Sequence, residues 1–378
     1  MTNAESTAGI DADTAAVATH LESLLSETLE AREAVAVVHA GSDCDPAVCY
    51  CRPQLAAENG LAAVAFDGET WLVETATDAA GHPAEALAAT LCERVGSGTI
   101  LTPARLPHDA ALYLEQAGFD LASTDVIERA RATKTERERE RIASAQRAAA
   151  AGVRRGASLL ADATIEDGHL VVDGEMLTPD RLRIAVDAGI VSAGAFPAGN
   201  TVVNPDPDHR PSSLNAGGEA LCPGEPIVLE TAPRGPAGYH GGLVRTFVVD
   251  GDGGRERRAH VGVTQSFHSA AAMLTADTES VTAVEADLEA EVRAFGFEDA
   301  DTVQTRVTGV GLEPRERPRS GGDGIDPGSV VRLESAVNVA DGQWLQIADL
   351  LVKGDEGERA AYLPACSRSL DPAAVLEE

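Results

Sequence analysis

Hydrophobic and polar positions in the first third of the chain change repeatedly between helical and strand spacing. Apolar residues recur at the helical interval in some segments, and others are short β-branched runs. Asp67 and Gly68 separate two such runs, which predicts a hairpin turn. The alternation predicts an α/β domain over residues 1–130. We expect helices at residues 14–32, 84–95 and 108–119, and strands at residues 33–40 and 61–66.

A charge-dense stretch near Thr135 opens a second pattern. It becomes a long amphipathic helix, and Thr178 followed by Pro179 is typical of another helix start. Short apolar runs separated by turns then indicate strands. Helices and mainly antiparallel strands mix, so we predict an α+β domain over residues 131–378. The expected strands lie at residues 226–233, 238–251, 329–339 and 344–353.

The charge balance limits the classes of partner. Asp and Glu number 61 against 30 Lys and Arg, the net charge is -31, and Lys134 and Lys353 are the two lysines. A chain without a basic stripe repels nucleic acid and anionic membranes, so we expect neither as a partner. Acids spread along the whole chain favour adaptation to high salt over one cationic partner, because salt screens self-repulsion. Stability after dialysis into low salt would contradict this halophilic hypothesis.

The chain start offers no targeting signal. Residues 1–20 have no basic region followed by an apolar one, and no apolar run is long enough to span a bilayer. We therefore predict a cytoplasmic protein.

Several ordered landmarks resemble one family of enzymes. They are RATKTERERERIASAQRAA, GEPIVLETAPRGPAGYHGGLVRTFVVDG, VTGVGLEPRERP, VVRLESAVNV and LQIADLLV. Over residues 125–370 the chain resembles the pita-bread metallopeptidases, which include Xaa-Pro aminopeptidase, Xaa-Pro dipeptidase, methionine aminopeptidase and creatinase. The resemblance implies a pita-bread carboxy-terminal domain, a smaller α/β amino-terminal domain and a homodimer.

The family's metal ligands are two Asp, one His and two Glu, which hold two divalent ions. By resemblance these positions fall at Glu230, Gly242, Thr308, Glu334 and Ala348, and a slip of one residue would move the first to Thr231. Three of the five cannot bind a divalent ion well. The resemblance thus implies no cofactor, or Mn, Co, Fe or Zn only if the two remaining glutamates suffice.

Arginines offer another way to satisfy the two glutamates. Glu230 and Glu334 are either remnant ligands or carboxylates paired with guanidinium groups, which would keep the local charge balance. Arg315 also stands where the family has a histidine. The arginines that could form these pairs are Arg245, Arg306, Arg315 and Arg332.

Two histidines are candidates for proton transfer. The creatinase branch works without metal and uses a histidine, so His209 and His240 are either catalytic or plain surface residues. Tyr239, Arg245 and Arg315 are the candidate binding residues by the same resemblance. Together these positions predict a non-catalytic homologue that binds a peptide or protein. The alternatives are an active Xaa-Pro peptidase with a degenerate metal site and a metal-free, creatinase-like hydrolase.

Overall fold

The chain divides into two compact units, Met1–Thr135 and Glu136–Glu378, in the computed structural model. The structure describes residues 4–42, 45–51, 60–76, 81–205, 207, 219–299, 301–355 and 357–377. In this part of the chain, no helix is both long and apolar enough to cross a membrane.

The first unit is a mixed five-stranded sheet with helices. The strand order is β3-β2-β1-β4-β5. Strands β1, β4 and β5 are parallel to one another, β2 is antiparallel to β1, and β3 is antiparallel to β2. The predicted α/β class of this unit is confirmed. Its elements are α1 (Ala4–Arg32), β1 (Ala36–Ser42), α2 (Pro46–Cys51), β2 (Leu61–Phe66), β3 (Trp71–Thr75), α3 (Pro83–Val95), β4 (Thr99–Thr102), α4 (His108–Gln116), β5 (Asp120–Ser123) and α5 (Val126–Ala132).

The hairpin predicted at Asp67 and Gly68 joins β2 to β3. The Asp67 carboxylate accepts hydrogen bonds from the backbone N–H groups of Glu69 at 3.0 Å and Thr70 at 2.8 Å. Gly68 has a φ of 92°, a left-handed conformation that glycine adopts without strain. Local turn chemistry therefore explains this part of the fold.

The second unit is built around a seven-stranded, mainly antiparallel sheet. Its central order is β13-β15-β16-β11-β10-β9, and β17 pairs with β16. The elements are α6 (Glu136–Ala161), β6 (Thr164–Glu166), β7 (His169–Val172), β8 (Glu175–Met176), α7 (Pro179–Ser192), β9 (Val202–Val203), β10 (Pro226–Thr231), β11 (Leu243–Val248), α8 (Arg255–Ala276), β12 (Glu279–Ser280), α9 (Val281–Arg293), β13 (Val303–Gly309), β14 (Gly324–Ile325), β15 (Val330–Ala340), β16 (Gln343–Val352), β17 (Ala361–Tyr362) and the 3-10 turn η1 (Ala373–Val375).

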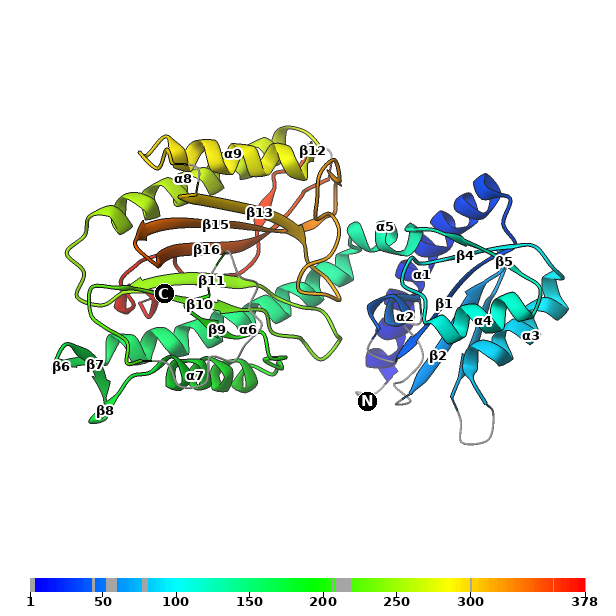
Figure 1. Ribbon diagram of the computed structural model, residues 1–378, viewed down its shortest axis with the longest axis horizontal. Helices are drawn as coiled ribbons and strands as arrows, with labels where there is room; N and C mark the ends of the chain where they lie inside the picture. Colours follow the sequence, from blue (N-terminus) through cyan, green and yellow to red (C-terminus); the bar gives the residue numbers. More distant parts are fainter. Residues whose placement is uncertain are drawn as a thin grey trace. The chain divides into compact units, whose positions relative to one another are not determined.

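Two pairs of helices cover one face of this sheet. Helices α6 and α7 pack against Leu229 and Phe247 of β10 and β11, and α8 and α9 pack against Leu333 and Ile347 of β15 and β16. Figure 1 shows the first pair along β9 and β10 and the second pair along β13. Because neighbouring residues of a strand point to opposite faces, the residues between these apolar positions lie on the other face. That other face carries the candidate site.

Close packing fixes helix α7 next to α6. A Cβ added at Gly189 would lie 2.9 Å from the Cα of Gly152, so the two helices meet backbone to backbone. Thr178 caps α7 as predicted, since its hydroxyl accepts a hydrogen bond from the N–H of Arg181 at 3.3 Å. This contact places the first turns of α7 beside β9 and β10, at the edge of the site.

Candidate functional site

Strand pairing brings the two predicted glutamates to one face of the sheet. Glu230 pairs with Val244, Val244 with Ala348, and Ala348 with Glu334. Residues that are directly opposite each other in antiparallel strands point to the same side. Glu230 and Glu334 therefore share the face opposite the one on which Leu229 and Leu333 lie, although 104 positions separate them in the chain.

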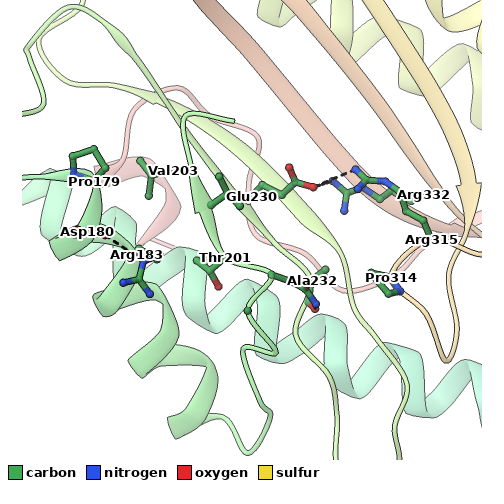
Figure 2. A pocket seen from close by; sticks show the side chains of 13 residues that line it. Pro179, Asp180, Arg183, Thr201, Val203, Glu230, Ala232, Pro314, Arg315 and Arg332 are labelled. Carbon is green, nitrogen blue, oxygen red and sulfur yellow. Dashed lines mark hydrogen bonds and ion pairs between the residues drawn. The ribbon is translucent and has the colours of Figure 1, made fainter. Parts of the chain in front are cut away.

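Two arginines bridge these carboxylates. Arg332 Nη2 donates to Glu230 Oε1 at 2.7 Å, and Arg315 Nη2 donates to Glu230 Oε1 at 3.2 Å and to Glu334 Oε2 at 2.8 Å. Arg332 Nε also lies 3.1 Å from Glu334 Oε2. Figure 2 shows the guanidinium groups of Arg315 and Arg332 at the carboxylate of Glu230. The structure thus forms the glutamate–arginine pairing that the sequence suggested for these two arginines.

Burial makes these charges depend on one another. The side chains of Glu230 and Glu334 are 10% and 12% exposed, and that of Arg332 is 1% exposed. Burial would raise the pKa of Glu334, but Arg332, Arg315 and Arg306 favour the ionised form and lower that pKa to about 2. Burial would likewise lower the pKa of Arg315, and the two glutamates raise it. Glu334 and Arg315 therefore both carry charge at neutral pH.

Arg332 fills the space beside Gly242. A Cβ added at Gly242 would lie 3.3 Å from Arg332 Nη1 and 3.5 Å from its Cδ, so the lack of a side chain leaves room for the guanidinium. Thr308 is buried and pairs with Arg332 across β13 and β15. Ala348 packs in a small apolar cluster with Val244. Gly242, Thr308 and Ala348 are the positions at which the resemblance implies lost metal ligands, and they are thus surrounded by a guanidinium group and by apolar side chains.

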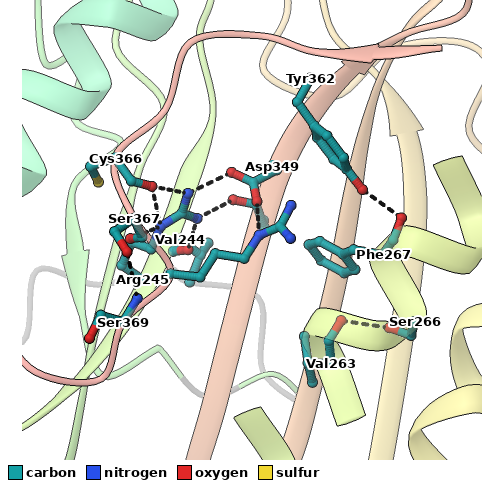
Figure 3. Close-up of polar contacts among 12 residues, drawn as sticks. Val244, Arg245, Val263, Ser266, Phe267, Asp349, Tyr362, Cys366, Ser367 and Ser369 are labelled. Atoms are coloured by element: carbon teal, nitrogen blue, oxygen red, sulfur yellow. Dashed lines mark hydrogen bonds and ion pairs between the residues drawn. The ribbon is translucent and has the colours of Figure 1, made fainter. Parts of the chain in front are cut away.

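Arg245 lies on the opposite face of the sheet, under the chain's last segment. Its Nη2 contacts Asp349 Oδ1 at 2.7 Å and the carbonyl of Cys366 at 2.7 Å, and its Nε donates to the carbonyl of Ser367 at 2.8 Å. Asp349 also accepts from Arg368 Nε at 2.6 Å. Figure 3 shows this network around Arg245 and Asp349. Since Arg245 is 1% exposed, the structure gives it a role in the fold and no surface for a ligand.

The remaining predicted residues have different surroundings. Tyr239 is buried and its hydroxyl donates to Glu138 Oε1 of α6 at 3.1 Å. His240 is buried, with Nδ1 3.1 Å from the carbonyl of Ala232, and burial lowers its pKa. The imidazole is consequently neutral at pH 7. His209 lies outside the described residues.

A cavity of about 150 Å³ adjoins the bridged carboxylates. Helix α7, strand β9 with the segment before it, strand β10, the loop at Pro314 and strand β15 form its walls, and Arg183 of α7 is among the lining residues (Figure 2). Arg183 matches none of the motifs that indicated the other candidate residues. The sequence spacing of three and four residues indicates that Arg183 can pair with Asp180 and Asp187 on one helix. Its position at this cavity, in contrast, depends on how α7 packs.

Donor groups for a metal do not gather in the part of the chain that the structure describes. No group of three or more His, Cys, Asp or Glu side chains lies there in an arrangement that could hold an ion. The two carboxylates that face the cavity side of the sheet are in contact with guanidinium groups instead.

An antiparallel sheet that is backed by two helix pairs defines the pita-bread class of protein, as predicted. The model of metallopeptidase family M24 matches residues 140–353, and the chain belongs to this family. No curated protein sequence matches the chain.

Solved structures with the same fold include proteins of different names. Prolidase from Pyrococcus furiosus is 16% identical with a TM-score of 0.69, covering 91% of this chain and 100% of its own. Xaa-Pro dipeptidase from Bacillus anthracis is 14% identical with a TM-score of 0.72, covering 93% and 99%. The N-terminal domain of FACT complex subunit SPT16 from Cicer arietinum (chickpea) is 15% identical with a TM-score of 0.67, covering 95% and 98%. At these identities the similarity defines the fold.

Proposed function

We propose that this member of the M24 family is a non-catalytic protein that uses the cavity beside Glu230, Arg315 and Arg332 to bind a peptide or a protein. The observation that carries the proposal is the contact of Arg315 and Arg332 with both glutamates, at 2.7 to 3.2 Å. Each carboxylate is thereby neutralised by the protein itself, and neither needs a metal ion to offset its buried charge.

The donor set does not fit a pair of divalent ions. Glycine and alanine supply no side-chain donor at Gly242 and Ala348, and Thr308 supplies one neutral hydroxyl. A divalent ion would also meet the buried Arg332. Two unit charges 4 Å apart interact by about 4 kcal/mol at an effective dielectric constant of about 20, and a doubly charged ion would be repelled about twice as strongly.

The fold's occurrence in other proteins is compatible with a binding role. Prolidases share it, and so does a domain named as part of a complex subunit. A fold supports several functions, so the argument rests on the residues of the site. We also propose, from sequence alone, that the protein is a cytoplasmic, salt-adapted homodimer.

Metal content and hydrolysis test the proposal together. Protein purified in high salt is analysed for Mn, Co, Fe and Zn by elemental mass spectrometry, and the same samples are incubated with glycyl-proline and each metal. We expect substoichiometric metal that does not change in a Glu230→Ala/Glu334→Ala variant, and no hydrolysis.

Two other outcomes would each contradict the proposal in a recognisable way. Stoichiometric metal that is lost in the double variant, with hydrolysis, would identify an active peptidase. Hydrolysis that survives a chelator and disappears in His240→Asn would identify a metal-free hydrolase.

A further inference from the structure

The sheet of the second unit carries another pocket, of about 470 Å³, near the turn between β15 and β16. Asn338 and Trp344 line this Trp344 pocket, and they lie directly opposite each other on the two strands, so they point to the same side. Asn338 is four positions after Glu334, and Trp344 is four positions before Ala348. The pocket therefore lies on the face that carries Glu230 and Glu334, about 13 Å farther along the strands.

Hydrogen bonds fix the part of the pocket wall that Asn204 and Pro205 form. The N–H of Asn204 donates to the carbonyl of Val228 at 2.8 Å, and Oδ1 of Asn204 accepts from the N–H of Val228 at 2.8 Å. The carbonyl of Pro205 accepts from Nε2 of the buried Gln346 at 2.7 Å. The pocket is therefore largely preformed, as sites for small molecules usually are.

The two tryptophans of the chain differ in how their rings are used. Trp71 packs against Phe66, with ring centroids 5.2 Å apart, and its Nε1 donates to Glu22 at 2.9 Å. Trp344 is half-buried, and among the described residues it has neither an aromatic neighbour in contact nor an acceptor for Nε1. Its partner across the strands is the polar Asn338. The apolar face and the N–H donor of this indole are thus both available to a ligand.

Amide and carboxylate groups surround this indole. The side chains of Asn338, Gln343 and Glu225 line the pocket, and they form no hydrogen bond or ion pair with other residues that the structure describes. A side-chain amide both donates and accepts hydrogen bonds, and a carboxylate accepts them. A hydroxyl group also both donates and accepts, so it can pair with any of the three side chains.

The charge of the pocket disfavours an ionic ligand. Glu225 is the one charged residue among those that line it. Its carboxylate would repel an anion, and because it is exposed it would attract a cation only weakly in water. The volume has room for roughly fifteen waters at about 30 Å³ each, which is more than one six-membered ring with its hydroxyl groups displaces.

We infer that the Trp344 pocket binds a saccharide, whose ring packs its C–H groups against the indole while its hydroxyls pair with Asn338, Gln343 and Glu225. The inference is independent of the proposed function, because no residue lines both this pocket and the described cavity at Glu230. The saccharide is either a free sugar or a unit of a longer glycan, and both offer a ring that carries hydroxyl groups.

Tryptophan fluorescence tests the inference with glucose, galactose, mannose, N-acetylglucosamine and maltotriose. Tetraproline is a further probe, because Pro205 and Pro226 also line the pocket and an aromatic groove can bind a proline-rich peptide. A Trp71→Phe protein reports on Trp344 alone. A Trp344→Phe protein reports on Trp71 alone and is the control for bulk effects of the sugars. Calorimetric titration of the wild type is a second measurement that does not depend on the folding of either variant.

We expect at least one sugar to give a saturable change in Trp71→Phe, with a dissociation constant in the millimolar range, and no change in Trp344→Phe. By calorimetry, Asn338→Ala and Gln343→Ala should each weaken binding by about threefold to tenfold. Gln265→Ala, at an exposed position of α8 outside the pocket, should leave it unchanged.

The probes also separate the two sources of the sugar. Tighter binding of maltotriose than of glucose assigns the pocket to a longer glycan, and equal or weaker binding assigns it to a single sugar. The inference is overturned if no sugar binds, if tetraproline binds in place of the sugars, or if Asn338→Ala and Gln343→Ala both bind as the wild type does.

Discussion

Two arginine clusters lie on opposite faces of the same sheet, and they differ in how fully their donors are used. On the helix-covered face, Nε, Nη1 and Nη2 of Arg245 all donate hydrogen bonds, to Asp349 and to backbone carbonyls. On the other face, Arg315 and Arg332 bridge two glutamates, and the Nε of each has no hydrogen-bond partner among the described residues. Both clusters bury arginine in an acidic chain, but in the second one Arg315 is 31% exposed and can reach solvent.

This difference separates a structural network from a binding site. A completely satisfied network stabilises the fold and gives a ligand nothing to bind. A partly satisfied one is costly unless something supplies the missing acceptors. Changes to the Arg245 cluster should therefore affect stability alone, and changes to the cluster of Arg315 and Arg332 at the cavity should affect both stability and ligand binding.

The largest effect is expected from Asp349→Asn. The side chain of Asp349 is 3% exposed and contacts Arg245 and Arg368 at 2.7 and 2.6 Å. Removing its charge leaves both arginines without a counter-charge, which should lower the free energy of unfolding by about 3–5 kcal/mol. Denaturant unfolding in high salt measures this, with the exposed Asp355→Asn as the control. An unchanged midpoint would contradict a structural role for the Arg245 cluster.

A somewhat smaller loss, about 3 kcal/mol, is expected from Glu334→Gln at neutral pH. The substitution leaves Glu230 as the one acidic partner of Arg315 and Arg332 in their cluster. Part of the cost is avoided because Arg315 is 31% exposed and can reach water. Glu298→Gln, at an exposed position, is the control. Equal stability of the two variants would show that the bridge contributes nothing.

Sequence patterns predicted the fold better than the site, because the fold signals are local. The start of α7 at Thr178 and the turn at Asp67 depend on neighbours within three residues. That Arg332 and Glu334 share a face also follows from their spacing of two on one strand. The sequence could not tell that Arg245 pairs with Asp349, since that depends on how distant strands and the chain's last segment pack.

Acid should remove the contribution of Glu334 in the wild type. Its pKa is lowered from 4.5 to about 2 in the folded protein, so its stabilisation is complete above pH 4.5 and is lost as the pH falls to about 2. Glu334→Gln has no such group to protonate. The difference in unfolding free energy between wild type and variant should therefore shrink over this interval, and a constant difference would contradict the lowered pKa.

The smallest effect is expected from Gly242→Ala. The new methyl group would lie 3.3 Å from Arg332 Nη1, which requires a shift of a few tenths of an ångström and should cost about 1 kcal/mol. Gly322→Ala, where a Cβ would meet nothing within 4 Å, is the control and should be neutral or slightly stabilising. Equal stability of the two variants would show that Arg332 shifts without cost, which would distinguish it from the enclosed Arg245 on the other face of the sheet.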